Sequence, residues 1–524
     1  MIHKQMKHQF YAKSILLLLL LLPFSLDAQD KPNLLWGTPT ESLKGYEINK
    51  VFGTGDDVFY VFRKNRRKKY PYALQKISTD SLIILGERIF SLSEINGTQP
   101  RIIQTLNIGK KLYFIAVTES SASDSIHMYA YEILDKPNIN PSPTLLAKVN
   151  AQAVNYKSSF TIFKDDINEL FALILPQETD PQKNEKFELL LFNSLLEKVN
   201  SKHIEVPYPA DIWEYTDVLV DDSGAIYVLA SITNSSLSAL NKDRNIGKNF
   251  SLFKYTWETE TLVEKSLSLG SKWLYDVRLF LNENNHIQVA GYYSNMVDLI
   301  MAGTFSLELN KSTGKILNQG INAFDREFRS KFRPKGGNIA ETELGMFNLD
   351  YVFPRADGTT QLISEKNYTE TSTVFNPGTG TYSIITVYNY DEILVTTINE
   401  SSKIKYNIMI HKFQSSTSSF DNYTSYISFS DGERSFFIYN DNDRNTGLDI
   451  DASQGYRQLT SSVNAAVILV VVHKDGEMVK IPLYTSNKEK PVLNPHFFYQ
   501  TRDGVVLLTN SGYDSQFLKL KLSQ

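Results

Sequence analysis

Apolar positions alternate with polar ones in short runs along most of the chain, and tight polar turns separate these runs. The stretch 217–231, DVLVDDSGAIYVLAS, is a clear case, with its turn at Ser223-Gly224. The stretch 276–292 repeats the arrangement, and a Trp-x-Tyr sequence precedes both. Alternation with a period of two predicts strands, and the small polar turn residues favour antiparallel hairpins.

The same hairpin pattern recurs eight times. Its turns lie near Gly55-Asp56, Gly109-Lys110, Asp165-Asp166, Ser223-Gly224, Asn284-Asn285, Asp357-Gly358, Asp431-Gly432 and Asp503-Gly504. A third apolar run follows every hairpin, and a fourth follows most of them. Four short antiparallel strands in a repeated unit are typical of a β-propeller blade.

The last unit contains only three strand-like runs, whereas the segment 33–42 precedes the first hairpin and belongs to no complete unit. Pairing these two parts closes a ring and covers two open strand edges. We therefore predict an all-β protein, a single β-propeller domain over 29–524, with eight four-stranded blades and an N-terminal strand closing the last blade. The alternative is two or three β-sandwich domains, which the absence of a Pro/Gly/Ser-rich linker disfavours.

The first residues have the pattern of an export signal. Lys4, Lys7 and Lys13 precede an unbroken apolar run over 15–22, and small residues follow up to Ala28. This order predicts a signal peptide over 1–28 and an exported protein, periplasmic or at the cell surface. An uncleaved membrane anchor is the alternative. No later segment is apolar enough to form a spanning helix, which leaves peripheral membrane contact open.

Composition narrows the chemistry further. The chain has no cysteine, so disulfides, thiolate metal sites and a cysteine nucleophile are excluded. Its formal net charge of −4 gives no sign of a nucleic-acid-binding protein. No zinc, nucleophile-elbow, P-loop or dinucleotide motif is present. No cofactor is therefore predicted, apart from the calcium interpretation below.

Four long connections interrupt the repeat. The segments 232–249, 366–389 and 440–463 join second to third strands, and 322–345 joins two blades. In a propeller all four project from the same face, where loops on a rigid scaffold often carry function. We predict that this face is the binding surface; the alternative is neutral variation in loop length.

Two kinds of side chain on these connections are candidates for partner contacts. The segment 322–345 combines basic residues with Phe at helical spacing, which predicts a short amphipathic helix. The main interpretation is a helix packed by its Phe face with solvated charges, and the second is a contact with an anion or a partner. The other connections carry aromatic residues. The candidates are Arg326, Arg329, Arg333, Phe375, Tyr382, Tyr388 and Tyr456.

The string DNDRNTGLDID places oxygen-bearing side chains at alternating positions, among them Asp441, Asp443 and Asn445. Calcium prefers such ligands. The EF-hand spacing is not met, however, because Gly447 comes one place late and Ala452 stands where the last ligand belongs. A hydrogen-bonded polar turn is the main interpretation and a calcium site the second.

Carboxylates recur at one position of the inner strands, at Asp217, Asp276 and Asp350. Structural hydrogen bonding is the main interpretation. Carboxylates around the central channel also permit glycoside cleavage, if two of them converge.

The hairpin sequences resemble short β-propeller repeats of secreted bacterial proteins. The part from about 324 to 445 is similar to a family of uncharacterised exported proteins of Bacteroidota. The matching pieces are Phe324 and Phe328, Asp357-Gly358 with Glu365 and Tyr368, YNYDEILV at 388–395, IHKFQ at 410–414 and YNDNDRN at 439–445. The resemblance implies export and a propeller fold, and brings no activity or catalytic residues.

The sequence therefore predicts an exported, non-catalytic cell-envelope propeller that binds a protein or glycan partner through its loop-rich face. The alternative is a carbohydrate-active hydrolase or lyase that uses carboxylates at the central channel.

Overall fold

A computed structural model gives the fold of residues 32–522. It does not describe 40–42, 44, 66, 121–123, 152–160, 166–168, 178–179, 234–247, 296–300, 331–343, 346, 377, 379, 419–421, 450–454 and 512–513. The expected signal peptide over 1–28 and Arg333 therefore lie outside the described residues. Among the described residues, no helix is long and apolar enough to cross a membrane.

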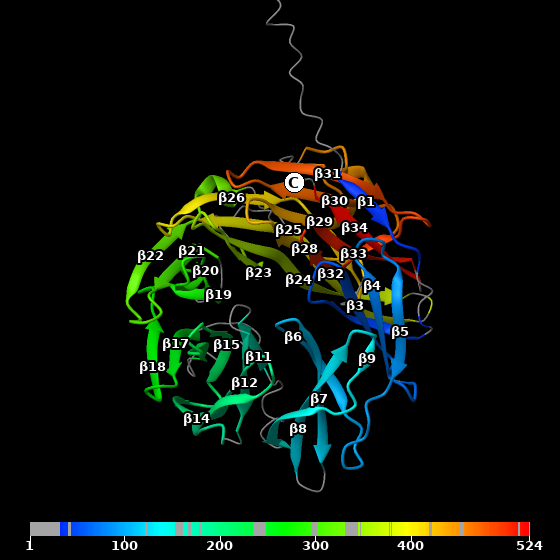
Figure 1. Ribbon diagram of the computed structural model, residues 1–524. Helices are drawn as coiled ribbons and strands as arrows, with labels where there is room; N and C mark the ends of the chain where they lie inside the picture. Colours follow the sequence, from blue (N-terminus) through cyan, green and yellow to red (C-terminus); the bar gives the residue numbers. More distant parts are fainter. Residues whose placement is uncertain are drawn as a thin grey trace, which may run out of the picture.

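Eight antiparallel sheets follow one another around a ring, in the order of the sequence (Figure 1). Blade 1 contains β2 (Glu47–Phe52), β3 (Val58–Lys64), β4 (Tyr72–Ser78) and β5 (Ile84–Phe90), and blade 2 contains β6 (Arg101–Ile108), β7 (Lys111–Ser120), β8 (Ser125–Leu134) and β10 (Thr144–Asn150), with β9 (Asn138–Ile139) beside β8. Blade 3 contains β11 (Thr161–Asp165), β12 (Leu170–Pro176), β13 (Asn184–Phe192) and β14 (Lys198–Pro209). Blade 4 contains β15 (Trp213–Val220), β16 (Ile226–Thr233), β17 (Lys248–Thr256) and β18 (Thr261–Leu267).

Blades 5 to 8 continue the same order from the inner to the outer strand. Blade 5 contains β19 (Trp273–Leu281), β20 (Ile287–Ser294), β21 (Gly303–Leu309) and β22 (Ile316–Ala323), and blade 6 contains β23 (Phe347–Pro354), β24 (Thr360–Asn376), β25 (Thr381–Ile398) and β26 (Ile404–Ile410), with β27 (Gln414–Ser416) beside β25. Blade 7 contains β28 (Tyr426–Ser430), β29 (Ser435–Asn442), β30 (Ala465–Val472) and β31 (Met478–Thr485). Blade 8 contains β32 (Val492–Thr501), β33 (Gly504–Ser511), β34 (Asp514–Lys521) and β1 (Asn33–Trp36).

The ring closes through the first strand of the chain. β1 pairs antiparallel with β34, in a register that sets Asn33 opposite Lys521 and Trp36 opposite Leu518. The Gly37 amide continues the pairing by donating to the carbonyl of Phe517 at 2.9 Å. This closure covers one edge of β34 and ties the two ends of the ring together. The prediction of eight blades with an N-terminal closing strand is confirmed.

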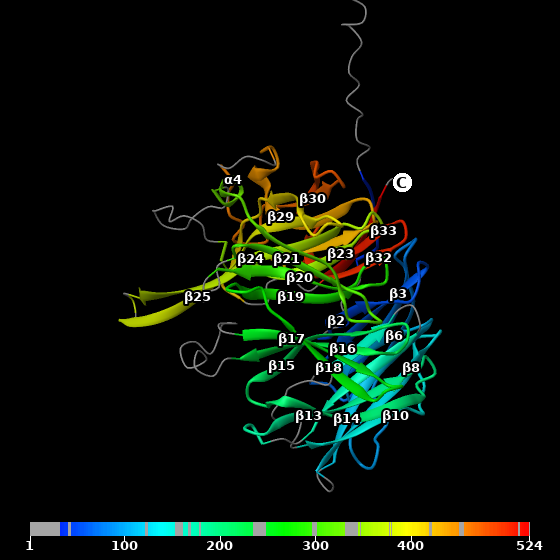
Figure 2. The same cartoon turned by 90° about the vertical axis from the view of Figure 1, so that its left-hand side faces the viewer.

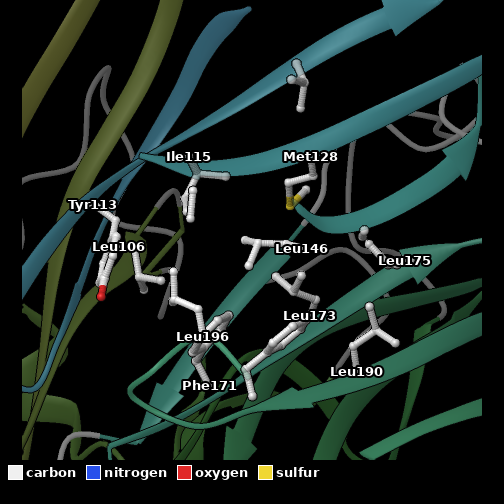
Figure 3. Close-up of a cluster of buried hydrophobic side chains, with 14 of the residues drawn as sticks. Leu106, Tyr113, Ile115, Met128, Leu146, Phe171, Leu173, Leu175, Leu190 and Leu196 are labelled. Carbon is white, nitrogen blue, oxygen red and sulfur yellow. The ribbon is translucent and has the colours of Figure 1, made fainter. Parts of the chain in front are cut away.

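The hydrophobic core lies between neighbouring blades. Figure 3 shows Ile115 and Met128 of blade 2 facing Phe171 and Leu173 of blade 3, all of them buried. Both faces of an inner sheet are covered in this way, which explains fully apolar strands such as β30, AAVILVVV. Fully burying a Val, Leu, Ile, Phe or Met side chain contributes about 1.5–3 kcal/mol.

Blade 6 departs from the regular pattern. Its strands β24 and β25 stay paired as far as Asn376 opposite Thr381, so that they form a long ribbon projecting from the disc (Figure 2). The segment 366–389, expected as a loop, is therefore a β-hairpin. Its Thr, Val, Ile and Tyr residues favour strands, and Gly380 adopts the positive φ of +67° that its turn requires.

We call residues 365–392 the arm. Its base comprises 365–370 and 388–392, where the strands leave the blade, and its tip comprises 371–387. Two other long connections form short helices: α4 (Arg326–Ser330) follows β22, and η1 (Asp443–Asn445) follows β29. The connection between β16 and β17, residues 234–247, lies outside the described residues.

Candidate functional site

The first two recurring carboxylates, Asp217 and Asp276, connect successive blades. Asp217 Oδ2 accepts a hydrogen bond from the backbone N–H of Leu279 at 2.9 Å, between blades 4 and 5. Asp276 Oδ2 accepts one from the N–H of Leu349 at 2.8 Å, between blades 5 and 6. Burial raises the pKa of Asp217, against the opposing effect of the Leu279 N–H donor and the Arg278 guanidinium. Both side chains therefore have a structural role in joining the blades.

Asp350 is the third recurring carboxylate, and its surroundings differ. Its Oδ2 accepts from the hydroxyl of Tyr426 at 2.8 Å, which links blade 6 to blade 7. Solvent reaches the side chain, yet protein crowds the carboxyl. This crowding, followed by repulsion from Glu365, raises the pKa of Asp350 to about 7, and Asp276 adds to the effect. Asp276 and Glu365 thus both act on the pKa of Asp350, near the inner strands of blades 5 and 6.

A buried ion pair lies at the base of the arm. Lys412 Nζ is 2.8 Å from Glu365 Oε1, and both side chains are almost completely buried. Lys412 also donates to the carbonyl of Tyr390 at 2.8 Å, while Glu365 Oε2 accepts from the Ser425 hydroxyl at 3.0 Å. The pair therefore fixes both strands of the arm and reaches the start of blade 7. A buried charge requires such partners, because desolvation is costly.

Further polar contacts surround this ion pair at the base. Lys366 Nζ lies 3.4 Å from Glu392 Oε2, and the Tyr368 hydroxyl donates to Asp391 Oδ2 at 2.8 Å. Burial raises the pKa of Glu392, which the Lys366 ammonium partly offsets. Both contacts cross from β24 to β25, so the base is held by side chains as well as by its backbone ladder.

The tip has the opposite character. Phe375, Tyr382 and Ile384 are 50%, 73% and 76% exposed. Phe375 and Tyr382 lie opposite each other in the register, with ring centroids 5.0 Å apart. Tyr388 is half-buried beside β27. Of the predicted aromatic contacts, the structure thus brings Phe375 and Tyr382 together at the tip.

Tyr456 was expected to be an exposed contact residue, and this expectation is wrong. Its side chain is only 8% exposed and packs on His411, with ring centroids 5.2 Å apart. Its hydroxyl donates to the carbonyl of Asp449 at 3.1 Å and accepts from Lys480 Nζ at 3.1 Å. The aromatic ring of Tyr456 fills an apolar space where the connection between β29 and β30 folds back onto the disc. The sequence alone could not reveal this packing.

The helix α4 is packed by its phenylalanines. Phe324 and Phe328 are buried, with ring centroids 5.5 Å apart. Arg326 is exposed and Arg329 is half-buried. This arrangement matches the main interpretation, a helix packed by its Phe face with solvated charges. Figure 2 shows α4 on the same side of the disc as the arm.

The predicted calcium residues form a hydrogen-bonded turn. The Arg457 N–H donates to the amide oxygen of Asn445 at 2.8 Å, so the Asn445 nitrogen points to Asp441 Oδ1 at 2.7 Å. Burial raises the pKa of Asp441 to about 6. Asp443 begins the short helix η1. Asn445 therefore presents a donor rather than an oxygen ligand to Asp441, and the described residues contain no group of three His, Asp or Glu side chains suited to a metal ion.

A hollow of about 350 Å³ opens between blades 4 and 5, on the side of the disc from which the arm projects. Its wall includes Tyr208, Lys248, Asn249, Trp273 and several serines. Aromatic surface beside amide and hydroxyl groups is suited to a small polar ligand.

The charged residues of the base were not predicted as a site. Only Lys412 carries a local signal, because it lies in the strand-like run YNIMIHKF at 406–413, whereas Glu365 stands among polar residues in ISEKN. A charged residue is rarely fully buried without a partner, so a buried Lys412 requires a partner elsewhere in the chain.

No protein-family model and no curated protein matches the chain. Solved structures do match. The β-propeller of the trilobed protease from Pyrococcus furiosus is 10% identical, with 85% of this chain and 97% of that chain covered and a TM-score of 0.34. The WD40 domain of SCAP from fission yeast is 8% identical, covers 94% and 98%, and has a TM-score of 0.37. A quinohemoprotein alcohol dehydrogenase from Pseudomonas putida is 9% identical, covers 91% and 76%, and has a TM-score of 0.39. With TM-scores this low, the propeller assignment rests on the eight sheets themselves.

Proposed function

We propose that the protein is an exported, non-catalytic component of the cell envelope that binds a protein or glycan partner through the face carrying the arm. The observation that carries the proposal is the tip, where Phe375, Tyr382 and Ile384 are exposed well away from the blade. Exposed apolar and aromatic clusters of this kind mark interaction sites in soluble proteins.

The construction of the base supports a binding role. Ordering a flexible loop on binding reduces affinity, whereas a contact surface that is already ordered avoids that cost. The Glu365–Lys412 pair and the Tyr368–Asp391 hydrogen bond fix the two strands before any partner arrives. The hollow beside Trp273 offers a second contact for a glycan on the same side.

Shortening the arm tests this proposal. Residues 371–386 are replaced by Asn-Gly, a two-residue turn that joins Glu370 to Val387 across the existing ladder. Affinity capture from native envelope is compared between the wild type, this variant and the Leu85→Ser variant, which removes an exposed apolar side chain from blade 1. We expect the wild type and Leu85→Ser to retain the same partner and the shortened protein to lose it. Unchanged capture by the shortened protein would contradict the proposal.

Export is tested separately. The basic and apolar pattern of 1–28 supports cleavage after Ala28. N-terminal sequencing of the protein from its native source should then begin at Gln29. A chain that keeps the apolar run over 15–22 would contradict cleavage and favour a membrane anchor.

Asp350 favours a second candidate function, carbohydrate hydrolysis or elimination at the central channel. A carboxyl that solvent reaches and whose pKa lies at about 7 can act as a general acid at neutral pH. Against this role, Asp276 and Glu365 are already engaged with Leu349 and Lys412. Assays of the wild type and Asp350→Asn on envelope and plant polysaccharides distinguish the two: activity lost in Asp350→Asn would favour the enzyme, and no activity in either protein would favour binding.

A further inference from the structure

The tip of the arm is a two-stranded ribbon with an open edge on β25. β27 covers β25 only at 388–390, and β26 covers it only from Ile393 onward. Over 381–387, the described pairing of β25 is with β24 alone. Backbone N–H and C=O groups on the other edge of this segment therefore point outward, as on any edge strand, and can pair with a further strand.

The open edge carries none of the features that usually prevent strand pairing. Residues 371–390 contain no Asp, Glu, Lys or Arg, although charged residues make up 21% of the chain and about four would be expected in twenty positions. The edge itself, TYSIITV, consists mainly of residues that favour strands. Edge strands are normally protected by charges, prolines or a covering element. This edge is therefore suited to receiving another strand.

We propose that the open edge of β25 pairs with the same edge of a second copy of this chain, antiparallel and about a two-fold axis at Ile384. In that register Ser383 lies opposite Ile385, and Tyr382 lies opposite Thr386. A two-fold axis sets a strand against itself, so any charge near the axis meets a like charge. The uncharged edge is the composition that such self-pairing requires.

The geometry of the arm agrees with a second copy as the occupant. Seven residues extend the edge by about 24 Å at a rise of about 3.4 Å each, which keeps the two discs apart. A lipid bilayer is a poorer occupant, because hydrocarbon cannot satisfy the outward backbone groups of a ribbon. Edge pairing leaves the faces of the ribbon free, so Phe375 and Tyr382 of both copies remain available to a partner. The inference therefore does not depend on the proposed function.

Light scattering after size exclusion, over a range of concentrations, tests the pairing on the chain from Gln29 onward. A single strand pair is smaller than a standard interface, so we expect a dimer whose fraction rises with concentration. Ile384→Lys sets two ammonium groups against each other at the axis and should give monomer at all concentrations. Ile89→Lys, at an exposed position on β5, should dimerise like the wild type. Circular dichroism spectra should show that all three proteins are folded. A monomeric wild type, or a dimer kept by Ile384→Lys, would overturn the proposal.

Cysteine cross-linking tests the register, because the natural chain contains no cysteine. At the proposed axis two copies of residue 384 lie within disulfide distance, whereas residue 382 faces residue 386. Under mild oxidation Ile384→Cys should form a covalent dimer several-fold faster than Tyr382→Cys. Equal rates would overturn the two-fold at Ile384. Flotation of a monomeric wild type with phospholipid vesicles, lost in Ile384→Lys, would instead assign the tip to lipid and overturn the dimer.

Discussion

The base and the tip of the arm belong to the same two strands, yet they are built from opposite chemistry. The base places Glu365 and Glu392 in the interior and gives each a cation, Lys412 at 2.8 Å and Lys366 at 3.4 Å. The tip places Tyr382 and Ile384 in solvent and contains no charged residue. A buried, hydrogen-bonded base fixes the direction of the arm, whereas an exposed apolar tip contributes little to folding. The base therefore fixes the arm on the disc, whereas the tip is the part available for contact with a partner.

The largest expected effect comes from breaking the ion pair. Lys412→Met leaves the Glu365 carboxylate buried without its cation, and should lower the free energy of unfolding by about 3–5 kcal/mol. Urea denaturation measures this loss. The double variant Lys412→Met with Glu365→Leu removes both charges and should recover much of the stability. A loss below about 1 kcal/mol for Lys412→Met alone would indicate an ion pair no stronger than one at the surface.

A smaller effect is expected from the hydrogen bond that crosses the base. Tyr368→Phe removes the hydroxyl that donates to Asp391 and should lower the free energy of unfolding by about 1–2 kcal/mol. Hydrogen exchange should also become faster at the amides of 388–392. Unchanged stability and exchange would show that the backbone ladder alone holds the base.

The pH dependence of stability tests the crowding around Asp350. Its pKa of about 7 in the folded protein lies above the ordinary value near 4, so the native state binds more protons than the unfolded state between about pH 4 and pH 7. Stability should therefore fall as the pH rises through this window. Because solvent reaches the side chain, we expect a contribution of about 1 kcal/mol or less.

Asp350→Asn is the matched variant, since its amide oxygen can still accept from Tyr426. It should be slightly more stable than the wild type at pH 8 and should show a flatter pH dependence between pH 4 and pH 7. Thermal melts across this range measure both. An unchanged slope would mean that Asp350 titrates normally.

The smallest effect on stability should come from the tip. Tyr382→Ser removes a side chain that is 73% exposed, so the free energy of unfolding should stay within about 0.5 kcal/mol of the wild type. Capture of the partner should nevertheless weaken. A clear loss of stability would show that the tip packs on the disc, and the contrast with the base would then fail.

The sequence was sufficient to predict the ring, because hairpin turns and period-two alternation are local signals. Asp357-Gly358 and Asp431-Gly432 mark their turns without reference to the rest of the chain. The closing strand was predictable as well, since it had no partner in its own unit. The extra length between the second and third strands led to a loop over 366–389, although its Thr, Val and Ile residues favour the ribbon that the structure contains.

The site was less accessible to prediction, because its contacts depend on residues far apart in the chain. Asp217 is joined to Leu279 through the order of the blades, and Lys412 to Glu365 through the order of the strands within blade 6. Neither spacing has a fixed sequence signature. Tyr456 shows the same limit, since an aromatic residue in a long connection can be exposed or can fill a space in the fold. Burial of that kind is decided by tertiary packing.

The central claim, that the tip of the arm meets a partner, is tested most directly by photo-crosslinking in cells. A benzophenone amino acid is placed at position 382, in the tip, or at position 85, which is 57% exposed on blade 1. We predict a cross-linked species from position 382, distinct in mass from two copies of the chain, and none from position 85. No such species from position 382, or the same one from both positions, would contradict the claim.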